Sequence, residues 1–129
     1  MNNKLIYVGI YPLACINTEL YAEVGARRGE GSFRTGTNSH PRLTVGIGGD
    51  WEDTVDLLLH EALEQCLSAY NHRWMPDSGG NASDECLFVF NHPQFDMICT
   101  QTAWFLVRAI PDLAAVWRTH SSPTKGRKK

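Results

Sequence analysis

The residues best suited to chemistry are a histidine and two glutamates within one short run. The run 57–64 reads Leu-Leu-Leu-His-Glu-Ala-Leu-Glu, so His60 and Glu64 stand four residues apart. In an α-helix, side chains at i and i+4 share a face, and one imidazole and one carboxylate there can bind a single ion. Both groups are ligands of Zn²⁺. The spacing therefore predicts part of a metal-binding site, with zinc as the expected metal.

Two further residues extend this pattern toward catalysis. Glu61 directly follows His60, as the glutamate does in the His-Glu-x-x-His motif of metallopeptidases, where it is the general base for the metal-bound water. Glu64 replaces the second histidine of that motif, and His92, at the start of a second apolar segment, can supply the missing imidazole. His60, Glu64 and His92 give two histidines and one glutamate, the ligand inventory of a thermolysin-type zinc site in a changed order.

The motif is expected on a helix from about 51 to 70. Asp50 stands where an N-cap belongs, and carboxylates follow it in the first turn. On a helical wheel, Glu61 falls on the polar side, and His60 and Glu64 fall on the boundary with the core stripe. That stripe comprises Val55, Leu58, Leu59, Ala62, Cys66 and Tyr70. That boundary is where the lip of a cleft would lie.

The remaining helices and strands are predicted from local composition and from the prolines and glycines that interrupt them. Residues 4–11 and 42–47 have the composition and pattern of strands, with Pro12 ending the first. Residues 20–24 are either a short helix or a strand, and the stretch 25–41, rich in Gly, Arg, Ser and Thr, is a loop or a wide hairpin.

A second helix is expected from about His92 to Ile110, after a cap at Asn91. Pro111 is expected to end it, with a short helical segment after it. The whole predicts an α+β fold, in which a small antiparallel sheet from the N-terminal third packs against two main helices. The metal would lie between the first helix and the start of the second.

The pattern from the strand before 57–64 to the helix opened by His92 resembles the small phage- and prophage-encoded zincin-like proteins. Their minimal domain carries a His-Glu-x-x-Glu helix and a later histidine, matched here by His60, Glu61, Glu64 and His92. The first 40 residues lie outside this resemblance, and the loop between the helices is longer here. The resemblance implies a zinc metallopeptidase-like hydrolase acting on a peptide or protein, in the host cytoplasm if the chain is phage-encoded.

Composition bounds the other classes of function. The chain has 129 residues and a net charge of −2, which favours one domain over 1–120 and argues against nucleic acid as a partner. The basic segment 121–129 is expected to be a disordered tail. No segment approaches the ~18 apolar residues of a membrane span.

The cysteines and the aromatic residues add two expectations. Cys66 and Cys99 fall on apolar helix faces and are expected to be buried thiols, which fits a cytoplasmic chain. Four tryptophans and a long apolar second helix are compatible with a homodimer, although periodicity does not separate a core from an interface.

Three alternatives compete with a catalytic site. The motif at 60–64 is also typical of a solvated, salt-bridging helix face, although three preceding leucines and the later histidine favour a metal site. A structural metal would need a fourth ligand, such as Asp96 or Cys99. A non-catalytic phage accessory or anti-defence protein could keep a zincin-like scaffold and bind a protein partner through 25–41 or the basic tail.

Overall fold

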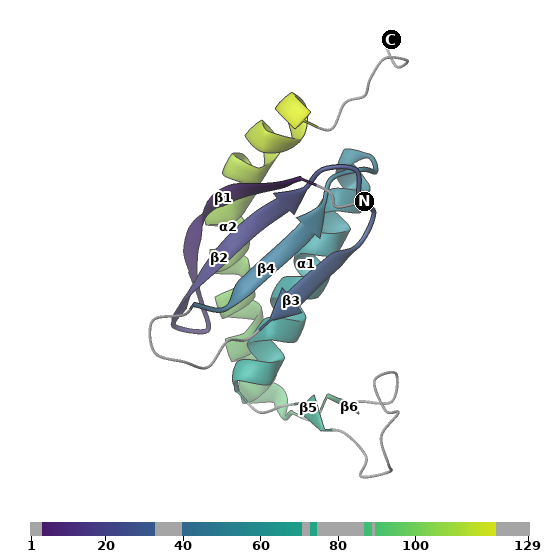
Figure 1. Ribbon diagram of the computed structural model, residues 1–129. Coiled ribbons are helices and arrows are strands. Elements are labelled where there is room, and N and C mark those ends of the chain that lie inside the picture. Colours follow the sequence, from purple (N-terminus) through teal and green to yellow (C-terminus); the bar gives the residue numbers. More distant parts are fainter. Residues whose placement is uncertain (1–3, 33–39, 71–72, 75–86, 89, 121–129) are drawn as a thin grey trace.

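Two helices pack on one face of a four-stranded sheet, and neither helix covers the other face (Figure 1). This computed structural model describes residues 4–32, 40–70, 73–74, 87–88 and 90–120. The elements in chain order are β1 (Leu5–Leu13), β2 (Ile16–Glu23), β3 (Gly29–Ser32), β4 (Arg42–Gly46), α1 (Trp51–Ala69), β5 (Arg73–Trp74), β6 (Leu87–Phe88) and α2 (His92–His120). The α+β class predicted from the sequence is confirmed.

The sheet is mixed, and the prediction of an antiparallel sheet was wrong. Its order is β1-β2-β4-β3, with β2 and β4 parallel and the other neighbours antiparallel. The reason lies in the chain path. After β2, the chain forms β3 at the far edge of the sheet, running opposite to β2. β4 then turns back beside β3 and fills the space between β3 and β2. A strand inserted in this way must run parallel to β2.

Two stretches that the sequence analysis did not assign fully to strands are strands in the structure. Residues 20–24, which fitted either a helix or a strand, belong mostly to β2. Strand β1 continues through Pro12 to Leu13, because β1 is an edge strand and the missing N–H of a proline costs no ladder hydrogen bond there. β3 and β4 form the wide hairpin that was one reading of 25–41, and the connection 33–39 lies outside the described residues.

Helix α1 begins and ends close to the predicted bounds. The Asp50 carboxylate accepts a hydrogen bond of 2.9 Å from the backbone N–H of Asp53, which confirms the N-cap. Asn91 caps α2 in the same way, because its side chain accepts from the N–H of Gln94 at 3.0 Å and Gln94 Oε1 accepts from the N–H of Asn91 at 2.8 Å. This reciprocal pair is a capping box.

Pro111 lies inside α2, so the prediction that it ends the helix was wrong. The proline is exposed, and the carbonyl it leaves unpaired can therefore be solvated. Ala109 and Leu113, on either side, are fully buried against the sheet. Tyr11 donates a hydrogen bond of 2.7 Å from β1 to Asp112. These anchors hold both halves of the helix in one line, and tertiary packing outweighs the local break.

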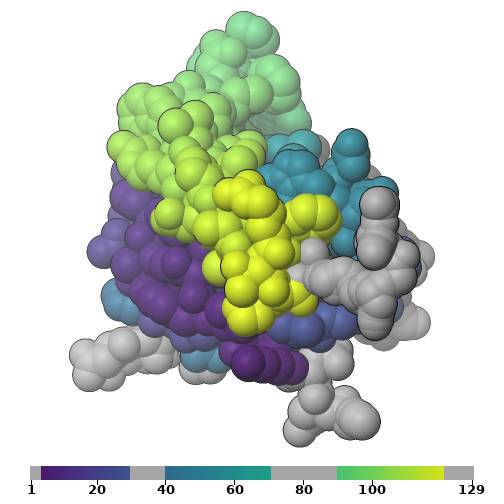
Figure 2. Space-filling model, turned by 90° about the horizontal axis from the view of Figure 1, so that it is seen from above, coloured from purple at the N-terminus to yellow at the C-terminus, as the bar shows by residue number. Residues whose placement is uncertain are grey.

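The helices run antiparallel beneath the sheet. Trp51 at the start of α1 contacts Trp117 near the end of α2, with ring centroids 5.6 Å apart. The Trp117 indole N–H also donates to the Gly49 carbonyl at 3.4 Å. Figure 2 shows the last turns of α2 lying beside β1 and the start of α1. Among the described residues, no helix combines the length and hydropathy that crossing a bilayer requires.

Candidate metal centre

An open hollow of about 240 Å³ lies between the start of β3 and the exposed flank of α1. Six residues line it, and they comprise two consecutive residues of the predicted motif together with neighbours from both elements: Arg28, Gly29, Asp56, Leu57, His60 and Glu61. The predicted cleft lip is therefore a feature of the molecule, and His60 lies in it.

His60 and Glu64 lie one turn apart on α1, as the spacing predicted. The imidazole Nε2 and the carboxylate Oε2 are 3.7 Å apart, and the side chains are 61% and 34% exposed. Two ligands held at about 2.0–2.2 Å from one tetrahedral Zn²⁺ lie about 3.4 Å apart. A small rotation of either side chain bridges the difference, so the pair fits one divalent cation.

Glu61 is buried, although the helical wheel placed it on the polar side of α1. Only 8% of the residue is exposed. Strand β3 covers that flank of the helix, and an added Cβ on Gly29 would lie 3.1 Å from Glu61 Cγ. The buried stripe of α1 is accordingly turned toward β3 and includes three polar residues: Thr54, Glu61 and Gln65. Leu59, expected in the core, is 38% exposed.

His92 does not lie with this pair. The contact of Trp51 on α1 with Trp117 on α2, at 5.6 Å between ring centroids, fixes the level of the two antiparallel helices. At 1.5 Å per residue, His60 lies about 14 Å along α1 from that level, and His92 lies about 37 Å along α2 in the same direction. The expected site between the first helix and the start of the second is therefore not assembled.

The imidazole of His92 pairs instead with its own helix. Its Nδ1 lies 3.6 Å from Asp96 Oδ2, and both side chains are largely exposed. Over the described part of the chain, no group of three His, Cys, Asp or Glu side chains is placed to hold a metal. Cys99, a candidate fourth ligand for a structural metal, is exposed on α2 rather than buried as expected, whereas Cys66 is buried.

Sequence reasoning missed three contributors to the hollow. Arg28 is fixed at its mouth because its carbonyl accepts a hydrogen bond of 2.7 Å from the N–H of Gly46. Gly29 lets the β3 backbone approach Glu61 closely. Asp56, one turn before His60, carried a usable signal in its i, i+4 spacing, whereas Arg28 and Gly29 lay in a stretch that reads as a loop.

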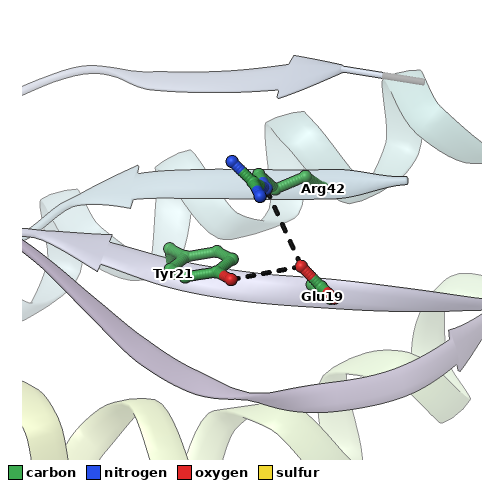
Figure 3. Close-up of polar contacts among 3 residues, drawn as sticks. All are labelled: Glu19, Tyr21 and Arg42. Atoms are coloured by element: carbon green, nitrogen blue, oxygen red, sulfur yellow. Dashed lines mark hydrogen bonds and ion pairs between the residues drawn. The ribbon is translucent and has the colours of Figure 1, made fainter. Parts of the chain in front are cut away.

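A second polar cluster lies on the uncovered face of the sheet. The Glu19 carboxylate accepts from the Tyr21 hydroxyl at 3.2 Å and lies 3.7 Å from Arg42 Nε (Figure 3). Arg42 also stacks over the Tyr21 ring, 4.9 Å from its centroid. Burial, and then the hydrogen bond to Glu19, raise the pKa of the Tyr21 phenol. These groups satisfy one another, so the cluster is a structural one.

The hollow on α1 is thus the site with chemical capacity. It places the exposed imidazole of His60 beside the buried carboxylate of Glu61 and is open to solvent, and Glu64, which does not line it, lies 3.7 Å from His60. Such an arrangement can bind a divalent cation and hold a proton acceptor beside it. Comparison with protein-family models, with curated proteins and with solved structures finds no match for the chain.

Proposed function

We propose that the chain is a zincin-like, metal-dependent hydrolase of phage or prophage type that acts on a peptide or protein in the cytoplasm. The observation that carries this proposal is the placement of consecutive residues in one hollow: His60 and Glu61 both line it, with Glu64 at 3.7 Å from His60. A salt-bridging surface helix does not require a buried glutamate beside the exposed pair. That difference favours a functional site over a solvated face.

The residues of the chain divide the work of hydrolysis. His60 and Glu64 would hold the cation, and Zn²⁺ in such a site would polarise a carbonyl and lower the pKa of a water. Glu61, buried between α1 and β3, would accept the proton of that water and later return it to the leaving amine. The close backbone of Gly29 limits the movement of Glu61, which holds this base in place.

The edge strand supports a peptide as the substrate. β3 is the last strand of the sheet, so one side of its backbone pairs with β4 and the other has no strand beside it among the described residues. An extended peptide can add to such an edge through main-chain hydrogen bonds. The hollow lies at the start of this strand. A peptide along β3 would therefore pass its carbonyls over His60 and Glu61.

Metal binding and metal-dependent stability test the proposal directly. Purified protein should hold zinc and should melt at a lower temperature after chelation. His60→Ala should remove both the metal and the chelator effect, whereas His92→Ala, the matched histidine control far from the hollow, should keep both. The metal site would be refuted if purified wild-type protein contained no zinc and its melting temperature changed with neither chelator nor added zinc.

Activity is tested separately from metal binding. Glu61→Gln should keep zinc and fold but lose about 10²–10⁴-fold in peptide hydrolysis, the usual contribution of a general base. Cleavage can be followed on a library of unstructured peptides by mass spectrometry. Equal turnover by wild type and Glu61→Gln would contradict the role of this residue.

A non-catalytic binding protein is the second candidate function. The observation that favours it is that the described residues bring together two metal ligands, whereas a catalytic zinc ordinarily takes three from the protein. Its partner would be a protein, bound in part through the exposed residues Arg27 and Arg28. A binder should be indifferent to Glu61→Gln and should lose its partner on Arg27→Glu with Arg28→Glu.

A further inference from the structure

One side of α2 is apolar and exposed, and we call it the outer face of the helix. It carries Ala103, Trp104, Val107 and Pro111, which are all exposed, Trp104 to 57% and Val107 to 72%. At about 100° per residue, these four side chains share the side of the helix opposite the buried Ala109. Helix α2 forms an outer flank of the molecule (Figure 2). A contiguous exposed apolar face is typical of an interaction surface.

Charges of opposite sign lie at the two ends of the outer face. Asp96 stands 11 residues before Val107 and Arg118 stands 11 residues after it, and both are exposed. About three helical turns take 11 residues, so both charges return to the side of Val107. Arg108, beside the centre, is directed onto its own helix, because its Nη1 donates to the Trp104 carbonyl at 3.1 Å. The outer face is therefore acidic at its N-terminal end, apolar in the middle and basic at its C-terminal end.

The outer face is complementary to itself when Val107 is taken as its centre. In two helices packed antiparallel around a two-fold axis, a residue before the centre lies level with the residue equally far after the centre in the other copy. Ala103 then lies level with Pro111, four residues to either side of Val107, and Asp96 lies level with Arg118. A parallel pair would instead place Asp96 against Asp96 and Arg118 against Arg118. The charges therefore favour a second copy of the chain, in the antiparallel orientation.

We propose that the outer face of α2 is the interface of a homodimer, in which the two α2 helices pack antiparallel across a two-fold axis at Val107. The Trp104 indole of each copy packs near Pro111 of the other, and the small Ala103 allows the helices to approach. Burial of the apolar centre supplies the affinity, and the charges at the ends set the orientation. One helix pair buries less than the ~800 Å² per partner of a standard interface, so the dimer should form at micromolar concentrations and dissociate on dilution.

The uncovered face of the sheet is the rival surface for a second copy. Leu5 and Tyr7 of β1 are 48% and 54% exposed. The charges of that face pair within one copy, since Glu19 lies 3.7 Å from Arg42, so they give a second copy less to bind. The proposed dimer does not depend on metal binding or hydrolysis. Helix α2 packs on β1 and β2, whereas the hollow lies between β3 and α1, so each copy would keep its hollow open.

Sedimentation equilibrium of the full chain from about 1 μM to 1 mM tests the dimer. Wild type should pass from monomer to dimer, and Val107→Lys should weaken the dimer at least about tenfold, because two like charges would meet on the axis. Leu5→Lys, the matched control on the sheet, should dimerise as wild type does, and circular dichroism checks that both variants fold. A wild type that stays monomeric would overturn the proposal and leave the outer face to another protein or to segment 121–129. So would a dimer that Leu5→Lys weakens, or that Val107→Lys leaves intact.

Disulfide cross-linking tests the antiparallel arrangement. The parent protein has serine in place of three cysteines: Cys15, Cys86 and Cys99. In this parent, Val107→Cys should oxidise to a dimer linked through position 107, as read by peptide mapping. Asp96→Cys alone should not cross-link, because its two copies would lie about 33 Å apart along the helices, but it should cross-link to Arg118→Cys when the two variants are mixed. Cross-linking of Asp96→Cys to itself would overturn the proposal, as would a Val107→Cys variant that stays uncross-linked at concentrations where the parent is dimeric.

Discussion

The two flanks of the sheet meet their helices in opposite ways. On the β1–α2 flank, the Tyr11 ring lies edge-on to Phe105 at 5.9 Å, and its hydroxyl bonds to Asp112 at 2.7 Å. On the β3–α1 flank, a glycine faces a buried glutamate and the surface is hollowed. An aromatic strand residue fills the space under the sheet, whereas a glycine leaves room for a carboxylate. The filled flank is therefore expected to contribute most to stability, and the hollowed flank carries the proposed site.

The largest effect is expected from the filled flank. Phe105 is completely buried, and Phe105→Ala should lower the free energy of unfolding by about 3–5 kcal/mol, through lost burial and the cavity left behind. Urea denaturation measures this change. Phe95→Ala, an aromatic control that is 45% exposed on the same helix, should cost far less. Equal losses from the two variants would remove the distinction between the flanks.

Tyr11→Phe should have the next largest effect. It removes the hydrogen bond to Asp112, at an expected cost of about 1–2 kcal/mol in the free energy of unfolding. Tyr7→Phe provides the control, because that ring is 54% exposed. A cost equal to that of the control would mean that the bond between β1 and α2 contributes nothing measurable.

The pH dependence of the same contact gives an independent measurement. Burial, and then the hydrogen bond to Asp112, raise the pKa of the Tyr11 phenol above its ordinary value. The folded state therefore favours the protonated phenol. Its stabilisation should be complete below about pH 10 and should fall as the pH rises beyond that value. Unfolding curves should be measured from pH 9 to 11, on either side of about 10, the ordinary pKa of the phenol. Over this range the free energy of unfolding should fall less in Tyr11→Phe than in wild type.

Gly29→Ala tests the glycine side of the comparison. The new methyl would lie 3.0 Å from the Thr44 carbonyl oxygen and 3.1 Å from Glu61 Cγ, so the glutamate must shift. We expect a loss of about 1 kcal/mol in stability and reduced hydrolysis. The stability loss should shrink in a Glu61→Ala background, which removes one of the two clashes. An undiminished loss there would show that the strand, and not the glutamate, bears the strain.

The smallest effect on stability is expected from the proposed metal ligands. The His60 side chain is 61% exposed, so His60→Ala in metal-free protein should change the free energy of unfolding by less than about 0.5 kcal/mol. Thermal melts in the presence of a chelator measure this. A large loss without metal would mean that His60 is structural.

Predictions from the sequence succeeded where the deciding interactions join residues close together in the chain. Asp50 and Asn91 were found as caps because capping is decided within four residues. The 60–64 spacing was likewise local, and His60 and Glu64 do lie together. Predictions failed where distant chain segments decide: β3 buries Glu61, and packing on the sheet carries α2 through Pro111.

The joint placement of His60 and His92 could not be read from the sequence. Their separation depends on how far the start of α2 extends past the end of α1. The periodicity of apolar residues shows which helix faces pack together but not how the helices are offset along their axes. The parallel pairing of β2 with β4 was hidden for a similar reason. A strand pattern records which residues face the core but not the order in which strands enter the sheet.

The position of β3 has a consequence for hydrogen exchange. Among the described residues, this strand of four residues pairs with β4 alone, whereas β4 pairs with a strand on each side. Its amides can therefore exchange with solvent through a local opening that leaves β1, β2 and the helices folded. In native-state exchange, β3 should form a separate unit of low opening free energy. The wall of the hollow could then detach and close again without global unfolding.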